Sequence, residues 1–182
     1  MSLLVTATVT AQPLFTKVDA AQSGVNFLNK VVETDSLHIM RYEYLYNGHG
    51  IGIGDFNKDG LPDIFFSGNM VEPALYINTG DFHFKNITSA AGIKYNNTWA
   101  TGVSIADVNG DGLDDIYISH SGYYPDDESK LANELWINQG ISNGVPSFKE
   151  MAAEYGLDLP GTQSTQAVFF DYDRDGDLDM FQ

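Results

Sequence analysis

Short apolar runs rich in Val, Ile, Phe and Tyr recur along the chain from residue 50 onward, and Gly, Asp and Asn bound them. This pattern is typical of β-strands separated by tight turns. The clearest runs form pairs that enclose an acidic segment, and the pattern therefore predicts an all-β fold. The pairs are residues 50–54 with 64–66, 103–106 with 116–118, and 168–170 with 180–181.

Each pair of predicted strands encloses the same nine-residue loop, which opens at Asp55, Asp107 or Asp171. Oxygen-bearing side chains stand at positions 1, 3, 5 and 9, and Gly at position 6 permits a sharp turn with positive φ. A hard cation such as Ca²⁺ takes six to eight oxygen ligands, so we predict one Ca²⁺ per loop and up to three in all. With the backbone carbonyl of position 7 included, the predicted ligands are Asp55, Asn57, Asp59, Leu61, Asp63, Asp107, Asn109, Asp111, Leu113, Asp115, Asp171, Asp173, Asp175, Asp177 and Asp179.

EF-hands and plain hairpin turns are the two alternative interpretations of the loops. An EF-hand requires Glu at position 12 between two helices, whereas Phe66, Ile118 and Gln182 stand there between strand-like runs. Plain hairpin turns need one or two Asp-Gly or Asn-Gly residues. They do not need four carboxylate or amide groups within nine positions, and such carboxylates repel one another unless a cation compensates them.

The loops belong to a longer repeat, because their first residues are separated by 52 and then 64 positions. Downstream of the loops, residues 74–80 match 134–140, and residues 84–87 match 148–151. Each unit thus supplies four short antiparallel strands, which is the content of one β-propeller blade. Short helical turns are expected at 89–91 and 150–155. The predicted divisions are blade 1 at 47–98, blade 2 at 99–163, and a truncated blade 3 at 164–182.

These loops and strands resemble FG-GAP repeats of the VCBS type, the calcium-bearing blades also found in integrin α chains. The Leu-Tyr-Ile-Asn-Thr-Gly segment that ends at Gly80, and the Phe-x-Asn-Ile-Thr segment that follows it, resemble the cartilage-acidic-protein-like branch. The resemblance covers residues 45–182 and implies a seven-bladed propeller. About two and a half blades are present, so we expect a fragment of a longer protein. The Phe-Gly and Gly-Ala-Pro signatures of integrins are missing, which weakens any transfer of integrin ligand binding.

The N-terminal residues 1–11 are apolar and end in small residues before Gln12, like the end of a secretory signal peptide. We expect a residual signal peptide or an added leader there, with a first β-strand as the alternative. Residues 12–46 show no repeat and form a lead-in segment, with a strand expected at 25–27. The chain has no Cys, so calcium would take the stapling role that disulfides have in other secreted proteins.

The chain carries 25 acidic and 9 basic residues, and its net charge is −16. So acidic a chain cannot offer an extensive phosphate-binding patch, which argues against nucleic acid and against anionic membrane surfaces. The apolar N-terminal run is too short to span a bilayer. We expect a secreted protein in the extracellular space or at the cell surface, or in the periplasm or on the outer surface if the source is bacterial.

Catalytic motifs are missing from the sequence. No His-Glu-x-x-His or Gly-x-Ser-x-Gly pattern occurs, and His120, the best candidate imidazole, fits a surface or capping role better. Trp99, Tyr123 and Tyr124 fit blade packing better than a sugar- or protein-contact surface. We therefore expect no enzymatic activity in this chain.

The leading hypothesis is a calcium-binding extracellular β-propeller module that binds a protein or a glycan in adhesion. The alternatives are the non-catalytic propeller portion of a larger secreted enzyme acting on glycans, and a scaffold with no ligand of its own. Because blades protect their sheet edges by ring closure, we also expect this chain to self-associate through open edges. We expect its third site to be weaker than the other two.

Overall fold

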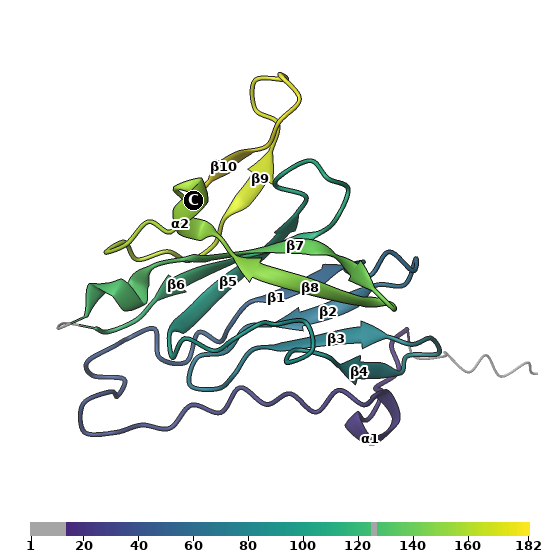
Figure 1. Ribbon diagram of the computed structural model, residues 1–182. Coiled ribbons are helices and arrows are strands. Elements are labelled where there is room, and N and C mark those ends of the chain that lie inside the picture. The colour runs from purple at the N-terminus through teal and green to yellow at the C-terminus, as the bar shows by residue number, and fades with distance from the viewer. Residues whose placement is uncertain (1–13, 125–126) are drawn as a thin grey trace, which may run out of the picture.

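A computed structural model describes residues 14–124 and 127–182 (Figure 1). The expected signal peptide or leader at 1–11 lies outside the described residues. The described part is built mainly of antiparallel β-sheets, and this confirms the all-β fold with propeller-like blades. No helix within those two ranges is long and apolar enough to cross a membrane.

Two sheets of four strands follow one another along the chain, and each is a meander in sequence order. The strands of the first sheet lie within the predicted first blade, and those of the second within the predicted second blade. The first sheet contains β1 (Ile51–Gly54), β2 (Asp63–Phe66), β3 (Ala74–Asn78) and β4 (Phe84–Asn86). The second contains β5 (Trp99–Ala106), β6 (Asp115–Ser121), β7 (Glu134–Ser142) and β8 (Val145–Glu150). A third, two-stranded sheet pairs β9 (Val168–Phe170) with β10 (Asp179–Phe181).

Three short helices accompany the sheets: α1 (Ala20–Ser23), the 3₁₀ helix η1 (Glu128–Leu131) and α2 (Ala152–Tyr155). α2 follows β8 and confirms the helical turn expected at 150–155. The corresponding place after β4 holds only a turn, in which the Ala91 N–H donates to the Ile87 carbonyl at 2.8 Å. The Ile87–Gly92 turn and α2 thus occupy the same place in the two blades, directly after the fourth strand.

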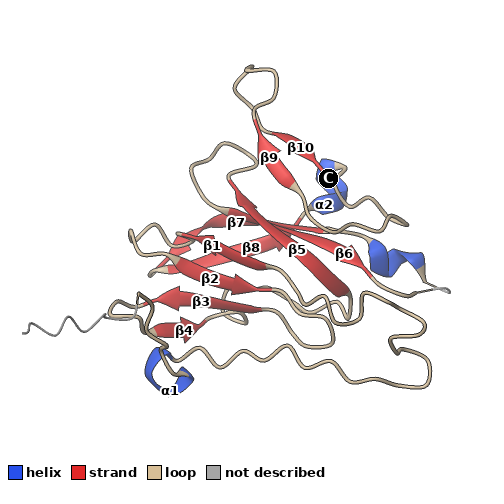
Figure 2. Cartoon of the chain, turned by 180° about the vertical axis from the view of Figure 1, so that it is seen from behind, coloured by secondary structure: helices blue, strands red, loops and turns tan. Residues whose placement is uncertain are grey.

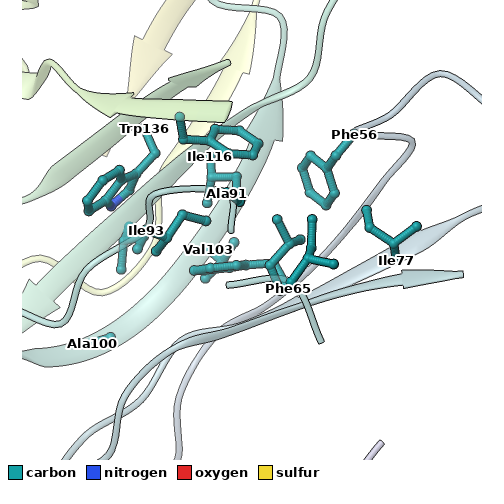
Figure 3. Close-up of a cluster of buried hydrophobic side chains, with 13 residues drawn as sticks. Phe56, Phe65, Ile77, Ala91, Ile93, Ala100, Val103, Ile116 and Trp136 are labelled. Atoms are coloured by element: carbon teal, nitrogen blue, oxygen red, sulfur yellow. The ribbon is translucent and has the colours of Figure 1, made fainter. Parts of the chain in front are cut away.

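The sheets pack face against face in chain order (Figures 1 and 2). Figure 3 shows the apolar layer between the first two sheets, where Phe65 from β2 meets Ile116 from β6 and Trp136 from β7. A second layer joins β6 and β7 to the third sheet through Tyr117, Leu135 and the partly buried side chains of β9 and β10. Alternate residues of each strand therefore face the preceding and the following blade, as the pleat requires.

The strand expected at 25–27 is wrong. These residues pair with no strand, because the lead-in is held against the first sheet by side chains rather than by a ladder. Phe27 stacks on Phe66 with a ring-centroid separation of 4.9 Å. The Tyr76 hydroxyl donates a hydrogen bond of 2.8 Å to Asn26 Oδ1. Later in the lead-in, Tyr42 and Leu45 are buried in one cluster with Trp99, which lies at the start of β5.

Candidate metal-binding loops

The three acidic loops are the connections β1–β2, β5–β6 and β9–β10. Each hairpin is in antiparallel register up to the residue that flanks its loop, with Gly54 opposite Asp63, Ala106 opposite Asp115 and Phe170 opposite Asp179. The strand–loop–strand units are as the sequence predicts, and no helix flanks any of the loops, which excludes the EF-hand.

In the first loop the acidic and amide side chains turn inward onto the loop backbone. The two carboxylate oxygens of Asp55 accept hydrogen bonds from the N–H groups of Asp59 and Gly60, at 3.0 and 2.9 Å. Asp59 Oδ1 accepts from the Leu61 N–H at 2.9 Å, and Asn57 Nδ2 donates to Asp59 Oδ2 at 2.8 Å. The side chains of positions 1, 3 and 5 therefore converge within one tight turn.

The second loop repeats this arrangement bond for bond. Asp107 accepts from the N–H groups of Asp111 and Gly112 at 3.0 and 2.7 Å. Asp111 Oδ1 accepts from the Leu113 N–H at 2.9 Å, and Asn109 Nδ2 donates to Asp111 Oδ2 at 3.0 Å. Two sequences that share the spaced polar residues, the glycine and the following leucine thus fold into the same oxygen-lined turn.

The third loop gathers its carboxylates more openly. Oxygen atoms of Asp171, Asp173 and Asp179 lie within 4.8 Å of one another, and all three residues are exposed. Such separations suit ligands of one Ca²⁺, since oxygens bound at 2.3–2.6 Å lie at most about 5 Å apart across the ion. Asp175 Oδ1 accepts instead from the Asp177 N–H at 3.2 Å. A hydrogen bond between the two side chains, together with the negative charge of Asp175, raises the pKa of Asp177.

Position 9 has a structural role in the first two loops that the sequence did not indicate. Asp63 is fully buried, and its two oxygens accept from the N–H groups of Phe56, at 3.0 Å, and of Asn78 in β3, at 2.8 Å. Asp115 does the same with Val108 and Asn138, at 2.9 and 2.8 Å. These carboxylates tie the loop to the third strand of the blade, and burial raises the pKa of both to about 6. An oxygen that accepts one hydrogen bond keeps a lone pair for a metal ion.

Asp179 differs from its two counterparts. One of its oxygens accepts from the Tyr172 N–H at 2.9 Å, as in the other loops. The residue is exposed, however, and it belongs to the carboxylate group with Asp171 and Asp173. The third loop thus brings positions 1, 3 and 9 close together.

Three further features of the loops and their surroundings were not predicted from the sequence. Asp114, at position 8, accepts the Asp55 N–H at 2.8 Å and lies 3.6 Å from Lys58 Nζ, so it joins the first loop to the second. Position 4 is left-handed in every loop, with φ of 53° at Lys58, 72° at Gly110 and 65° at Arg174. The glycine in the second copy was the one sequence signal for that conformation.

The third missed feature is the repeated Asn of β3 and β7. Asn138 Nδ2 donates to the Phe56 carbonyl at 3.1 Å, and this hydrogen bond joins the second blade to the loop of the first. Asn138 Oδ1 accepts from the Gly140 N–H at 3.1 Å. Asn78 makes the corresponding turn bond to Gly80 at 2.9 Å. The Ile-Asn-x-Gly repeat therefore serves the turn after the strand and the contact between blades.

The candidate imidazole and aromatic residues take structural positions. His120 is buried rather than at the surface, and its ring nitrogens lie 2.7 Å from the Ala132 carbonyl and 3.0 Å from Thr98 Oγ1. Trp99 is buried against Tyr42, and Tyr124 packs against the same cluster. Tyr123 alone of the three aromatics has a large exposed fraction, 41%.

Comparisons with known proteins agree with this geometry. Residues 45–118 match the model of the FG-GAP-like repeat family. Over 135 residues the chain is 27% identical to cartilage acidic protein 1 of Xenopus tropicalis, an alignment that covers 74% of this chain and 19% of that protein. The chain thus corresponds to about a fifth of the relative's length. The blade architecture, the repeated loops and the family match over residues 45–118 together support an FG-GAP repeat protein.

Proposed function

We propose that this chain is a calcium-binding, extracellular β-propeller module of the adhesion type, with a protein or a glycan as its ligand. The observation that carries the metal assignment is the identical inward arrangement of oxygen side chains in the first two loops, together with the convergent carboxylates of the third. One Ca²⁺ per loop is the expected complement.

The donor set fits calcium in chemistry as well as in spacing. Every side-chain donor in the loops is a carboxylate or amide oxygen, and such hard ligands suit Ca²⁺, Mg²⁺ or Mn²⁺ rather than Zn²⁺ or Cu²⁺. Each turn supplies several oxygens, which favours Ca²⁺, with its larger number of ligands and less demanding geometry, over Mg²⁺. A bound cation would also offset the repulsion between loop carboxylates in a chain whose net charge is −16.

An extracellular location follows from the same argument. Modest calcium sites are filled at the millimolar calcium of extracellular fluid and are often empty in the cytosol. The name of the relative, cartilage acidic protein 1, is consistent with an extracellular protein. The signal peptide expected at residues 1–11 would supply the export route.

A binding role is favoured over catalysis because His120, the best candidate imidazole, is buried in structural hydrogen bonds. The carboxylate group of Asp171, Asp173 and Asp179 belongs to a loop. A propeller portion of a larger secreted enzyme remains the second candidate. The full reading frame separates the two, since an attached catalytic domain would favour the enzyme.

Thermal unfolding with and without calcium tests the metal assignment. A ligand that binds only the folded state stabilises it by about 2.7 kcal/mol per site at one hundred times its Kd. We expect the unfolding temperature to rise by several degrees in millimolar calcium and to fall again with a chelator. An unfolding temperature that is the same under both conditions would show that the loops are plain hairpin turns without a bound cation.

A further inference from the structure

A cavity of about 910 Å³ opens at the ends of the strands opposite to the acidic loops. Trp99 pairs with Ser121 at one end of the β5–β6 hairpin, and the second acidic loop closes the other end. The cavity lies beside that Trp99–Ser121 pair. Its remaining walls come from residues 39–48 of the lead-in and from residues 163–165, which precede β9.

Tyrosine rings form much of the cavity wall. Tyr44 and Tyr123 line it with 53% and 41% of their surfaces exposed, so their rings are accessible to a ligand. Tyr42 and Trp99 are buried behind them and contact each other edge to face, with ring centroids 5.5 Å apart. Tyr42 also lies 5.9 Å from Tyr44, again edge to face. The accessible rings therefore stand on a packed aromatic base.

Polar groups of two kinds surround these rings. Gln163 is fixed, because its amide donates to the Gly122 carbonyl at 3.1 Å and accepts from the Gly122 N–H at 3.2 Å. Arg41, Glu43 and Asn47 are exposed and line the cavity. Within residues 14–124 and 127–182 their side chains make no hydrogen bond or ion pair that would have to be broken by a ligand.

We propose that this cavity binds an uncharged sugar unit of a glycan. The proposal rests on the binding role proposed above and selects one of its two ligand classes. The C–H face of a sugar ring is apolar and packs on a tyrosine ring, while its hydroxyl groups accept from Arg41 and Asn47 and donate to Glu43. The volume lies within the range of about 300–1,000 Å³ typical of small-molecule sites.

Charge selects against acidic sugars. Among the described residues, Arg41 is the one basic side chain that lines the cavity, and Glu43 stands two positions after it in the sequence. The negative field of a chain with net charge −16 repels uronates and sulfated sugars. A protein ligand fits the concave shape less well, because it would have to insert a single side chain or a narrow loop.

Saturation-transfer NMR with simple glycosides tests the proposal. The probes are methyl α-D-mannopyranoside, methyl β-D-galactopyranoside, methyl β-D-glucopyranoside and L-fucose, with D-glucuronate as the anionic comparison. For a single sugar unit we expect a Kd on the order of 1 mM for at least one neutral probe, and much weaker binding of glucuronate. The Tyr44→Ala/Tyr123→Ala double variant should weaken binding by about tenfold or more.

Tyr155→Ala is the matched control, since Tyr155 is 40% exposed but lies on α2 outside the cavity. It should leave the Kd unchanged. Asn47→Ala removes one exposed amide without touching the aromatic base, and it should weaken binding several-fold even if the double variant fails to fold.

Three results would overturn the sugar site: no saturation transfer to any neutral probe, transfer that persists unchanged in the cavity variants, or tyrosine-dependent selection of a peptide from a displayed library in place of a sugar. Calcium calorimetry on the same sample separates this failure from that of the metal assignment. Calcium heat without sugar binding overturns the cavity proposal alone, whereas sugar binding without calcium heat supports the cavity and overturns the metal sites.

Discussion

At the residue scale, the aspartate at the ninth position of the loops has different surroundings in different copies, although the sequence pattern is the same. Asp63 and Asp115 are buried and hold two backbone N–H groups each, whereas Asp179 is exposed and faces two other carboxylates. A buried carboxylate that accepts hydrogen bonds from two backbone N–H groups stabilises the fold even without a bound cation. The cost of removing it should therefore appear in calcium-free protein.

We predict that Asp63→Ala destabilises the chelator-treated protein by about 2–4 kcal/mol, because two buried N–H groups lose their acceptor. Asp179→Ala is the matched control and should cost well under half of that, since Asp179 is exposed and accepts one backbone hydrogen bond. Urea unfolding in the presence of chelator measures both. Equal losses in the two variants would contradict the structural role of Asp63.

A pH-dependent contribution is expected from Tyr117. Burial raises its pKa to about 12, and its hydroxyl donates to the Leu157 carbonyl at 2.9 Å. Because the pKa in the folded state exceeds the ordinary value of 10, the contribution to stability is complete below pH 10 and declines as the pH rises towards 12. The free energy of unfolding should fall over this interval, and Tyr117→Phe should show a shallower decline. Parallel curves for the two proteins would exclude Tyr117 as the cause.

At the element scale, the loop backbone is set by glycine at position 6. Gly60, Gly112 and Gly176 have φ of 84°, 85° and 99°, a left-handed conformation that other residues adopt at a cost. A Cβ at Gly112 would meet no atom within 4 Å, so steric clash does not enter. The conservation of the turn between the copies is therefore a matter of backbone conformation.

We predict that Gly112→Ala lowers the free energy of unfolding by about 1–2 kcal/mol, because alanine must adopt positive φ. Gly112→Asn should cost less, since asparagine tolerates this conformation better. Chemical denaturation of the two variants beside the parent protein checks the order. An alanine variant as stable as the parent would show that position 6 changes its conformation easily.

The sequence predicts the strand pairs around each loop, the four-strand blades and the turn glycines, because these depend on local spacing and on alternation within a few residues. It does not predict the bond between Asp55 and Asp114, or that between Asn138 and Phe56, since each joins residues far apart in the chain. The strand wrongly predicted at 25–27 also reflects contacts between residues far apart in the chain. Its apolar alternation serves contacts with Phe66 rather than pairing with a neighbouring strand.

At the scale of the whole molecule, equivalent residues of successive blades have contrasting environments. Phe65 and Tyr117 are buried between blades, whereas Phe181, which holds the same place in the third sheet, is 70% exposed. At the other end of the stack, Ile51 and Ile53 are 55% and 58% exposed. Their counterparts in the second sheet are Val103, which is buried, and Ile105, which packs against the core. The exposed surface around Phe181 in one copy of the chain could therefore pack against the exposed surface around Ile51 and Ile53 in a second copy. The two copies would then meet as successive blades do.

We predict concentration-dependent self-association of this chain, which Phe181→Asn should weaken because it removes the most exposed apolar side chain of β9 and β10. Phe82→Asn is the matched control. Phe82 is equally exposed, at 70%, but lies in the β3–β4 hairpin. Light scattering over a range of concentrations decides the matter. A monomer at all concentrations, or an equal effect of the two substitutions, would contradict the prediction.

The central claim is that the repeated loops are calcium sites, and calorimetric titration of Ca²⁺ into chelator-stripped protein tests it most directly. We expect at least two and up to three sites. Asp59→Ala and Asp111→Ala should each remove one, while Asp35→Ala, an exposed acidic residue of the lead-in, should remove none. The third site should be the weakest, since its position 9 is not anchored to a third strand. No heat at millimolar calcium, or loss of the same heat in all three variants, would contradict the claim.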